Sequence, residues 1–196
     1  MKSTAAYRCM PRSRLANDTL AIQALQPEHI ESVRLWRNAQ LPVLRQQHPI
    51  SRQQQIDYFS DVVWPALEHD QPSNILLACV VGDRLIGYGG LVHVAWADAR
   101  AEVSFLLDPE IVRSKEQYAR YFRAYLDLVA RLAFDDLSLH RLSGETYSMR
   151  SAHIEILESA GFQREGRLRE HVMIDGEFQD ALIHGLLASD WRATAP

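Results

Sequence analysis

The feature that most constrains the fold of this 196-residue chain is the order of its strand-like and helix-like segments. Apolar residues recur at three- and four-residue spacing from Tyr118 to Leu132, which predicts a long amphipathic helix in the middle of the chain. Strand-like segments lie on both sides of it, and the full expected order is βααβββαβαββ. This order is neither a regular βαβ alternation nor an all-β chain. We therefore expect an α/β (α+β) fold with a mixed, mostly antiparallel central sheet and helices on both faces.

The N-terminal part of the chain predicts an arm followed by a single domain. Residues 1–19 are polar and have no apolar period, so we expect a flexible arm there and one folded domain over residues 20–192. Within that domain Leu20–Leu25 is strand-like, and Pro27 suits the first position of a helix. A hydrophobic content of 47% is enough for a sizeable core.

Turn and cap residues define most of the other boundaries. Ser51 and Gln54 form a capping box that predicts a second helix, which we expect to end at Pro65. Two-residue turns at Gly82-Asp83 and Asp175-Gly176 predict two hairpins. The strand-like segments cover residues 75–81, 85–94, 101–107, 139–146, 171–174 and 177–187.

Composition excludes several classes of protein. No apolar run approaches the length of a membrane span, and the net charge of −4 does not favour general binding to nucleic acid. Cys9 and Cys79 are far apart and form neither a disulfide framework nor a metal-binding pair. The eight histidines show no zinc-binding spacing, so we expect no metal. These features are typical of a cytoplasmic protein.

Several short motifs in this order resemble one enzyme family. They are Trp36-Arg37-Asn38, Leu139–Thr146 (LHRLSGET), Ile154, Leu157-Glu158, Gly161-Phe162, Gly166–Glu170, Asp175-Gly176, Asp180–Ile183 and Gly185–Leu187. Together they resemble the GNAT N-acetyltransferases over about Leu20 to Trp191, and the branch of ribosomal-protein N-terminal acetyltransferases and nucleotide-amino-sugar N-acetyltransferases in particular. The three residues at Trp36 are similar to those of the sugar-modifying members.

The resemblance implies a function and its partners. It implies an acetyl-CoA-dependent N-acetyltransferase that transfers an acetyl group to a primary amine, with a small molecule such as a nucleotide-linked amino sugar as the first choice. A protein N-terminal amine is an alternative acceptor. A GNAT-fold binding or regulatory module that has lost acyl-CoA chemistry is a second alternative. Relatives of this kind often form homodimers.

The cofactor-binding residues implied by the resemblance depart partly from the family pattern. Backbone N–H groups at Phe105, Leu106 and Leu107 would pair with the pantetheine arm as an added strand does. The family's phosphate loop, Q/R-x-x-G-x-G/A, is here Arg113-Ser114-Lys115-Glu116-Gln117-Tyr118, without either glycine. The donors left at this loop are Arg113, Ser114 and Lys115. Three further family positions differ, since the usual Asn, Ser and Tyr are Arg150, His153 and Leu157.

The candidate catalytic residues are two glutamates on neighbouring strands. Amine acetylation needs a base, and Glu102 lies on the strand where related enzymes often place one. Glu145, on the next strand, is expected to orient the amine. Both also fit structural roles, as solvated residues or ion-pair partners. His93 and His140 are further bases only by position, because a lone strand histidine is commonly structural.

The candidate substrate-binding residues are Trp36, Arg37 and Asn38 at the end of the first helix. One face of a helix end can present an aromatic ring, a guanidinium and an amide together. For Trp36 a place in the core is the alternative.

Overall fold

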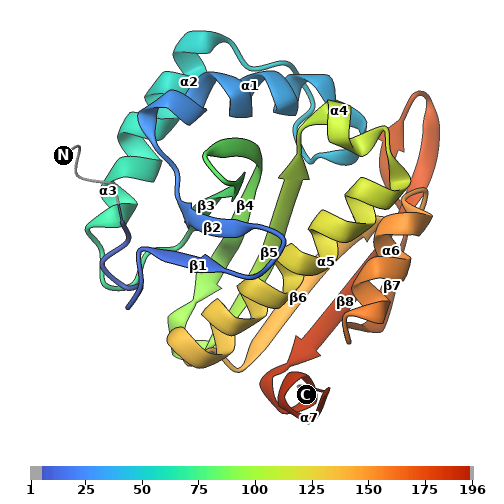
Figure 1. Ribbon diagram of the computed structural model, residues 1–196. Coiled ribbons are helices and arrows are strands. Elements are labelled where there is room, and N and C mark those ends of the chain that lie inside the picture. The colour runs from blue at the N-terminus through green and yellow to red at the C-terminus, as the bar shows by residue number, and fades with distance from the viewer. Residues whose placement is uncertain (1–5, 195–196) are drawn as a thin grey trace.

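The computed structural model describes residues 6–194 and has one eight-stranded sheet (Figure 1). The strand order is β1-β2-β3-β4-β5-β6-β8-β7, and only the β5/β6 pair is parallel. The strands are β1 (Arg14–Ala16), β2 (Ala21–Ala24), β3 (Ile75–Val81), β4 (Arg84–Ala95), β5 (Arg100–Leu107), β6 (Arg141–Tyr147), β7 (Gln163–Ile174) and β8 (Glu177–Leu187). This mixed, mostly antiparallel sheet confirms the predicted fold class.

The helices follow the predicted order with several short additions. The α-helices are α1 (Ile30–Ala39), α2 (Arg52–Tyr58), α3 (Trp64–Leu67), α4 (Pro109–Val112), α5 (Lys115–Arg131), α6 (Ser151–Ser159) and α7 (Ala188–Thr194). Short 3₁₀ or π segments are η1 (Pro27–His29), η2 (Leu41–Val43), η3 (Phe59–Val63), η4 (Trp96–Asp98) and η5 (Leu132–Asp136).

Helices cover both faces of the sheet because β3 is apolar on both sides. Ile75 and Leu77 belong to a core cluster with Phe122 of α5, while Leu76 belongs to a second cluster with Val33 of α1. Successive strand residues point to opposite faces, so these two clusters lie on opposite sides of the sheet. The sheet therefore has α5 and α6 on one face and α1 to α3 on the other.

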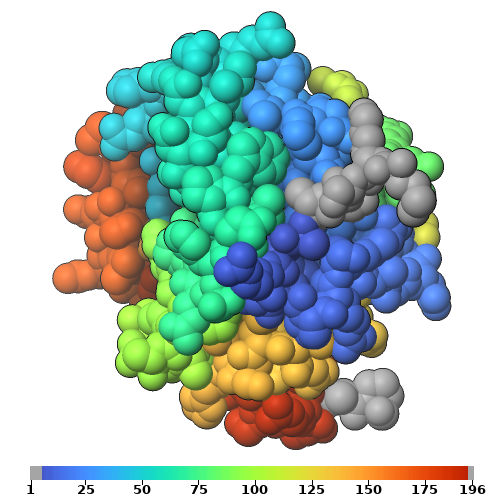
Figure 2. Space-filling view, turned by 90° about the vertical axis from the view of Figure 1, so that its left-hand side faces the viewer, coloured from blue at the N-terminus to red at the C-terminus, as the bar shows by residue number. Residues whose placement is uncertain are grey.

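The N-terminal segment differs from the irregular arm that its polar sequence predicted. Residues 14–16 form β1 at the edge of the sheet, and Tyr7 is 3% exposed. The Tyr7 hydroxyl accepts a hydrogen bond from the Leu76 amide at 2.8 Å, and the Arg8 amide donates to the carbonyl of Leu67 at 2.8 Å. Figure 2 shows the dark blue N-terminal residues against the teal residues of α3. This segment is ordered by contacts with residues distant in the chain, and such contacts leave no periodic pattern in the local sequence.

The second helical region continues past Pro65, although the sequence predicted that it would end there. The Ser51–Gln54 capping box is present in full and starts α2. The chain then passes through the π segment η3 and continues into α3, where Pro65 occupies the first turn. Pro65 has no N–H to donate, and the local change from α to π geometry in η3 lies directly before it.

Both predicted hairpin turns are present. Asp175 and Gly176 have φ of 50° and 84°, the two positive values that a type I′ turn requires, and Gly82 has φ of 59°. Strand β7 begins at Gln163 rather than at residue 171, and its register shifts between Leu168 and Val172. These irregular positions interrupt the two-residue alternation of β7, so the first part of the strand has no strand-like sequence pattern.

Candidate active site

The candidate active site lies where β5 and β6 separate. These parallel strands pair only through Arg100–Glu102 and Arg141–Ser143. After Glu102, β5 stays paired with β4 on its other side through Leu107, while β6 continues along β8. The sheet is therefore split open beyond Glu102, which leaves one edge of β5 without a strand partner.

A cavity of about 730 Å³ occupies this split and is lined from both faces of the sheet. Arg37 of α1 and Tyr58 of α2 line it on one side, and Phe122 of α5 and His153 of α6 line it on the other. Because helices from opposite faces share one cavity, it passes through the sheet between β5 and β6. Its volume is in the range of small-molecule and cofactor sites.

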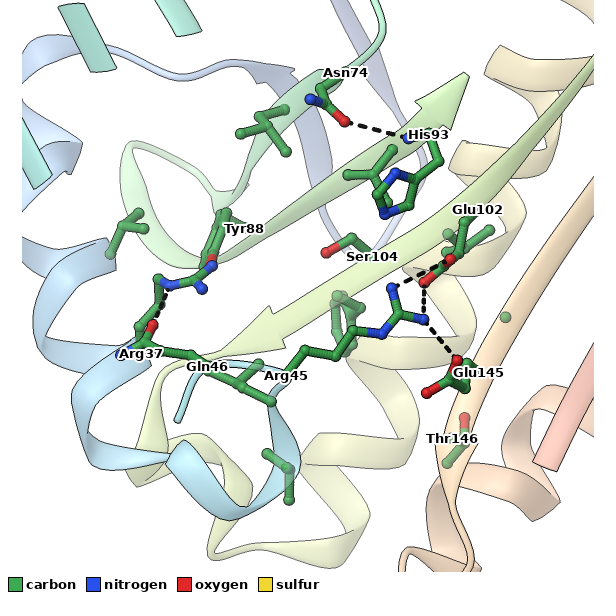
Figure 3. A pocket seen from close by; sticks show the side chains of 18 of the residues that line it. Arg37, Arg45, Gln46, Asn74, Tyr88, His93, Glu102, Ser104, Glu145 and Thr146 are labelled. Atoms are coloured by element: carbon green, nitrogen blue, oxygen red, sulfur yellow. Dashed lines mark hydrogen bonds and ion pairs between the residues drawn. The ribbon is translucent and has the colours of Figure 1, made fainter. Parts of the chain in front are cut away.

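The two predicted catalytic glutamates meet at this cavity through an arginine that the sequence did not single out. Glu102 on β5 and Glu145 on β6 both line it, and Arg45, from the connection between η2 and α2, reaches between them (Figure 3). The Arg45 Nη2 atom lies 2.9 Å from Glu102 Oε1 and 3.0 Å from Glu145 Oε2. Burial alone would lower the pKa of Arg45, but the attraction of both carboxylates outweighs it and raises that pKa. Arg45 is therefore a permanent cation in this state.

The predicted substrate-binding triplet is only partly at the cavity. Arg37 lines it, and its guanidinium donates to Tyr88 Oη at 2.8 Å and to Gln46 Oε1 at 2.7 Å (Figure 3). Asn38 instead binds the backbone of Ile50 in both directions, at 2.8 and 2.9 Å. Trp36 packs against the core cluster on the α1 side. The structure thus brings Arg37 to the site, while Asn38 holds the connection that carries Arg45.

The backbone predicted to contact the cofactor lies on the split edge of β5. Phe105 and Leu107 point toward α5 and Leu106 points toward the α1 face, because successive residues of a strand face opposite sides of the sheet. The Phe105 ring stacks on Phe122, with centroids 4.6 Å apart. The Leu107 carbonyl accepts a hydrogen bond from Gln40 Nε2 at 2.8 Å. The unpaired edge of β5 fits the added-strand contact that pantetheine requires.

The residues predicted to contact phosphates form the start of α5. Ser114 is the N-cap, and its hydroxyl accepts from the Gln117 amide at 3.3 Å. Arg113 pairs with Glu110 at 2.7 Å, with both side chains mostly exposed, and Lys115 is exposed. Since no glycine is present here, the phosphates of CoA would contact the capped N-terminus of α5 and the side chains of Arg113 and Lys115.

Three residues that replace or adjoin family positions form a hydrogen-bonded group on the α5 and α6 side. Arg150 Nη2 lies 3.0 Å from Tyr118 Oη, which lies 2.6 Å from His153 Nδ1. Because the Tyr118 oxygen accepts from Arg150, its proton is directed to His153 Nδ1. Burial, and then the nearby charge of Arg150, hold the pKa of His153 well below its usual range. His153 is therefore neutral at pH 7 and carries its proton on Nε2.

This neutral histidine predicts a loss of stability in mild acid. Since the folded pKa of His153 lies below its unfolded value near 6.5, the unfolded state binds the extra proton first as pH falls. We expect the free energy of unfolding to fall by up to about 1.4 kcal/mol for each pH unit below 6.5 because of His153. The His153 ring stacks on Phe122, with centroids 4.2 Å apart. His153→Phe can keep this stacking and should show a shallower pH dependence in urea unfolding between pH 7.5 and 5. Parallel curves for the two proteins would contradict the prediction.

Of the two histidines considered as bases, His93 lines the cavity and His140 does not. His93 lines the cavity, and its backbone N–H donates to Asn74 Oδ1 at 3.2 Å (Figure 3). His140 is exposed just before β6, and its amide donates to the Ala99 carbonyl at 2.6 Å. The start of β6 is the paired end of the β5/β6 split, so His140 is placed away from the cavity.

Residues 6–194 contain no group of three or more His, Cys, Asp or Glu side chains suited to a metal ion. Within the same residues, no helix is both long and apolar enough to cross a bilayer.

Comparison with known proteins supports the assignment of the fold. The chain is 30% identical to a probable N-acetyltransferase of Bacillus subtilis, YjcK, over 125 residues, which are 63% of this chain and 66% of that protein. The structure is similar to the spermidine N-acetyltransferase of Vibrio cholerae in complex with CoA and spermine. That likeness has a TM-score of 0.76 and 20% identity, and covers 90% of this chain and 99% of the other.

The family profile described as an acetyltransferase (GNAT) domain matches residues 22–183, which include every strand from β3 to β7 and all of the residues that bracket the split sheet. This chain belongs to the GNAT family of acetyltransferases.

Proposed function

We propose that the chain is an acetyl-CoA-dependent N-acetyltransferase whose acceptor is a small primary amine. The observation that carries this proposal is the cavity that passes between β5 and β6 and has a glutamate on each strand. Acetyl-CoA would enter from the α5 and α6 side and supply the thioester carbonyl. The acceptor would enter from the α1 and α2 side, where Glu102 and Glu145 face the opening.

The residues present suit the steps of acetyl transfer. Glu102 takes a proton from the acceptor's ammonium group, directly or through a water, and leaves a neutral nitrogen. That nitrogen attacks the thioester carbonyl, whose developing negative charge is stabilised by backbone N–H groups on the free edge of β5. Breaking the carbon–sulfur bond releases the thiolate of CoA, which takes up the second proton that the attacking nitrogen gives up as the amide forms. The amide and the free thiol are the products.

The acceptor is better described as a simple amine than as a nucleotide-linked amino sugar. The amino-sugar hypothesis rested on Trp36, Arg37 and Asn38, and two of these three side chains pack into the core or hold a loop. The acidic pair at Glu102 and Glu145 favours a positively charged group. The solved relative that is similar over 90% of this chain was crystallised with spermine, which is such an amine. A protein N-terminus remains the alternative acceptor.

A screen of amine acceptors tests this function. Purified protein with acetyl-CoA should release free thiol when a suitable small amine is added, at a rate well above hydrolysis without amine. Peptides with free N-termini, an amino sugar linked to a nucleotide, and alkyl diamines represent the competing acceptor classes. Thermal stabilisation by CoA without thiol release from any acceptor would instead favour the alternative of a binding module.

The start of α5 carries a separate prediction about the cofactor. We expect CoA to bind more tightly than pantetheine, because Arg113, Lys115 and the helix N-terminus favour its phosphates. Exposed charge pairs contribute about 0.2–1 kcal/mol each, so the Arg113→Ala, Lys115→Ala double variant should bind CoA about 2- to 30-fold more weakly. Its affinity for pantetheine should not change.

The matched control removes two positive charges farther along the same helix. Arg123→Ala, Arg131→Ala has the same net charge as the test variant and should keep the wild-type affinity for CoA. Calorimetric titration of both ligands into all three proteins gives the comparison. If wild type binds CoA and pantetheine equally, the start of α5 does not contact the phosphates.

A further inference from the structure

A single nitrogen of this chain occupies the space between the two glutamates of the cavity. Arg45 Nη2 lies 2.9 Å from Glu102 Oε1 and 3.0 Å from Glu145 Oε2, and Arg45 Nη1 is 3.4 Å from Glu102 Oε2 (Figure 3). One nitrogen that donates to both carboxylates is the arrangement that a primary ammonium group, with its three N–H donors, can also make. The Nη2 atom therefore marks a position suited to an ammonium ion.

The carboxylates and the cation are held very differently. Glu102 and Glu145 stand on paired strands of the sheet, with side chains 23% and 16% exposed. Arg45 comes from the irregular connection between η2 and α2, and its side chain is 50% exposed. Half-exposed ion pairs are weak because water competes for both partners. The glutamates are thus the fixed part of this site, and the arginine is the part that can exchange.

The pairing also has a consequence for the base. While Arg45 donates to Glu102, its two Nη atoms occupy both oxygens of that carboxylate, so an acceptor's ammonium group cannot reach them. Glu145 has a further neighbour, His171 Nε2 at 3.6 Å, whereas the described ion pairs of Glu102 involve Arg45 alone. Releasing Arg45 would therefore free Glu102 for proton transfer and leave two negative charges to be compensated.

We propose that Arg45 is a resident substitute for the acceptor's ammonium group, and that the acceptor is a cationic amine which displaces it. The incoming ammonium takes the position of Nη2 between Glu102 and Glu145, and the Arg45 guanidinium moves into solvent with its proton. Glu102 then removes one proton from the bound ammonium, as in the proposed acetyl transfer on which this inference rests. A neutral or anionic acceptor cannot replace the charge of Arg45, so this residue selects for cations.

Kinetics of an arginine variant test the competition. Removing Arg45 removes a competitor, so Arg45→Ala should lower KM for a cationic amine about 2- to 30-fold, as expected for two half-exposed ion pairs, with little change in kcat. Arg45→Lys keeps a cation that can reach the carboxylates and should stay near wild type. A purely structural role for Arg45 makes the opposite prediction, because the connection would lose an anchor. An unchanged or higher KM in Arg45→Ala overturns the proposal.

A binding measurement tests the site without relying on catalysis. Ethylguanidinium replaces the atoms that Arg45→Ala removes, and ethylurea is its uncharged isostere. Ethylguanidinium should raise the melting temperature of Arg45→Ala more than that of wild type, and ethylurea should raise neither. Adding Glu102→Gln and Glu145→Gln to Arg45→Ala should abolish the effect. Equal stabilisation of that triple variant overturns the cation site. If ethylguanidinium binds as expected but no amine releases thiol, the proposed enzyme function fails while the cation site stands.

Discussion

Replacing Glu102 with glutamine is expected to lower kcat for amine acetylation about 10²–10⁴-fold, the contribution of a well-placed general base. Glutamine keeps the shape of the side chain on β5 but cannot accept the proton from the ammonium group. The affinity for acetyl-CoA should change little, because its predicted contacts are backbone groups of β5 and the start of α5. Steady-state thiol release at saturating acetyl-CoA, together with CoA titration, measures both quantities.

Two control variants distinguish the loss of a base from the loss of any other carboxylate. Glu145→Gln should mainly raise KM for the amine, because this carboxylate is expected to position the ammonium and not to take its proton. Glu155→Gln removes an exposed carboxylate of α6 that is not among the cavity-lining residues, and it should behave as wild type. An unaltered rate for Glu102→Gln at neutral pH would eliminate Glu102 as the base.

Gly90→Ala is expected to destabilise the folded protein by about 2–6 kcal/mol, from backbone strain and overpacking together. Gly90 has φ of +129°, which side-chain-bearing residues rarely adopt, and an added Cβ would lie 1.9 Å from the Ile75 carbonyl oxygen. Its N–H also donates to the hydroxyl of Tyr125, which in turn donates to the Ser104 carbonyl at 2.5 Å. A shift of Gly90 would therefore disturb β5 next to the cavity. Urea unfolding at constant m-value measures the loss.

Gly82→Ala is the matched control for backbone conformation. Gly82 also has positive φ, +59°, but an added Cβ there meets no atom within 4 Å. We expect a cost of about 1–2 kcal/mol, the penalty for a left-handed residue alone. If Gly90→Ala is no more destabilising than Gly82→Ala, the close packing of β3 against β4 at this position is not as tight as the structure implies.

Local sequence signals were sufficient for most of the framework. The capping box at Ser51 and the turn at Asp175-Gly176 depend on residues no more than four apart, so their geometry is set by short-range hydrogen bonds and by the φ values available to glycine. Glu102 and Phe105 are three residues apart along β5, so the two-residue period of a strand places them on opposite faces of the sheet. Features that depend on long-range packing could not be predicted from local sequence. The burial of Tyr7 and the continuation of the helix beyond Pro65 are two such features.

The candidate site divides in the same way. The sequence by itself determined the order of elements, the family resemblance, and Glu102 and Glu145 as a pair on neighbouring strands. Only the tertiary structure decided that β5 and β6 separate just after Glu102, and that Arg45 reaches both carboxylates from 57 and 100 residues away in the chain. Arg45 lies in an irregular connection and is not part of a sequence motif. The position of its side chain is set by its ion pairs with Glu102 and Glu145 across the cavity. Periodicity and turn chemistry describe neighbours along the chain, whereas an ion pair over this distance depends on the whole fold.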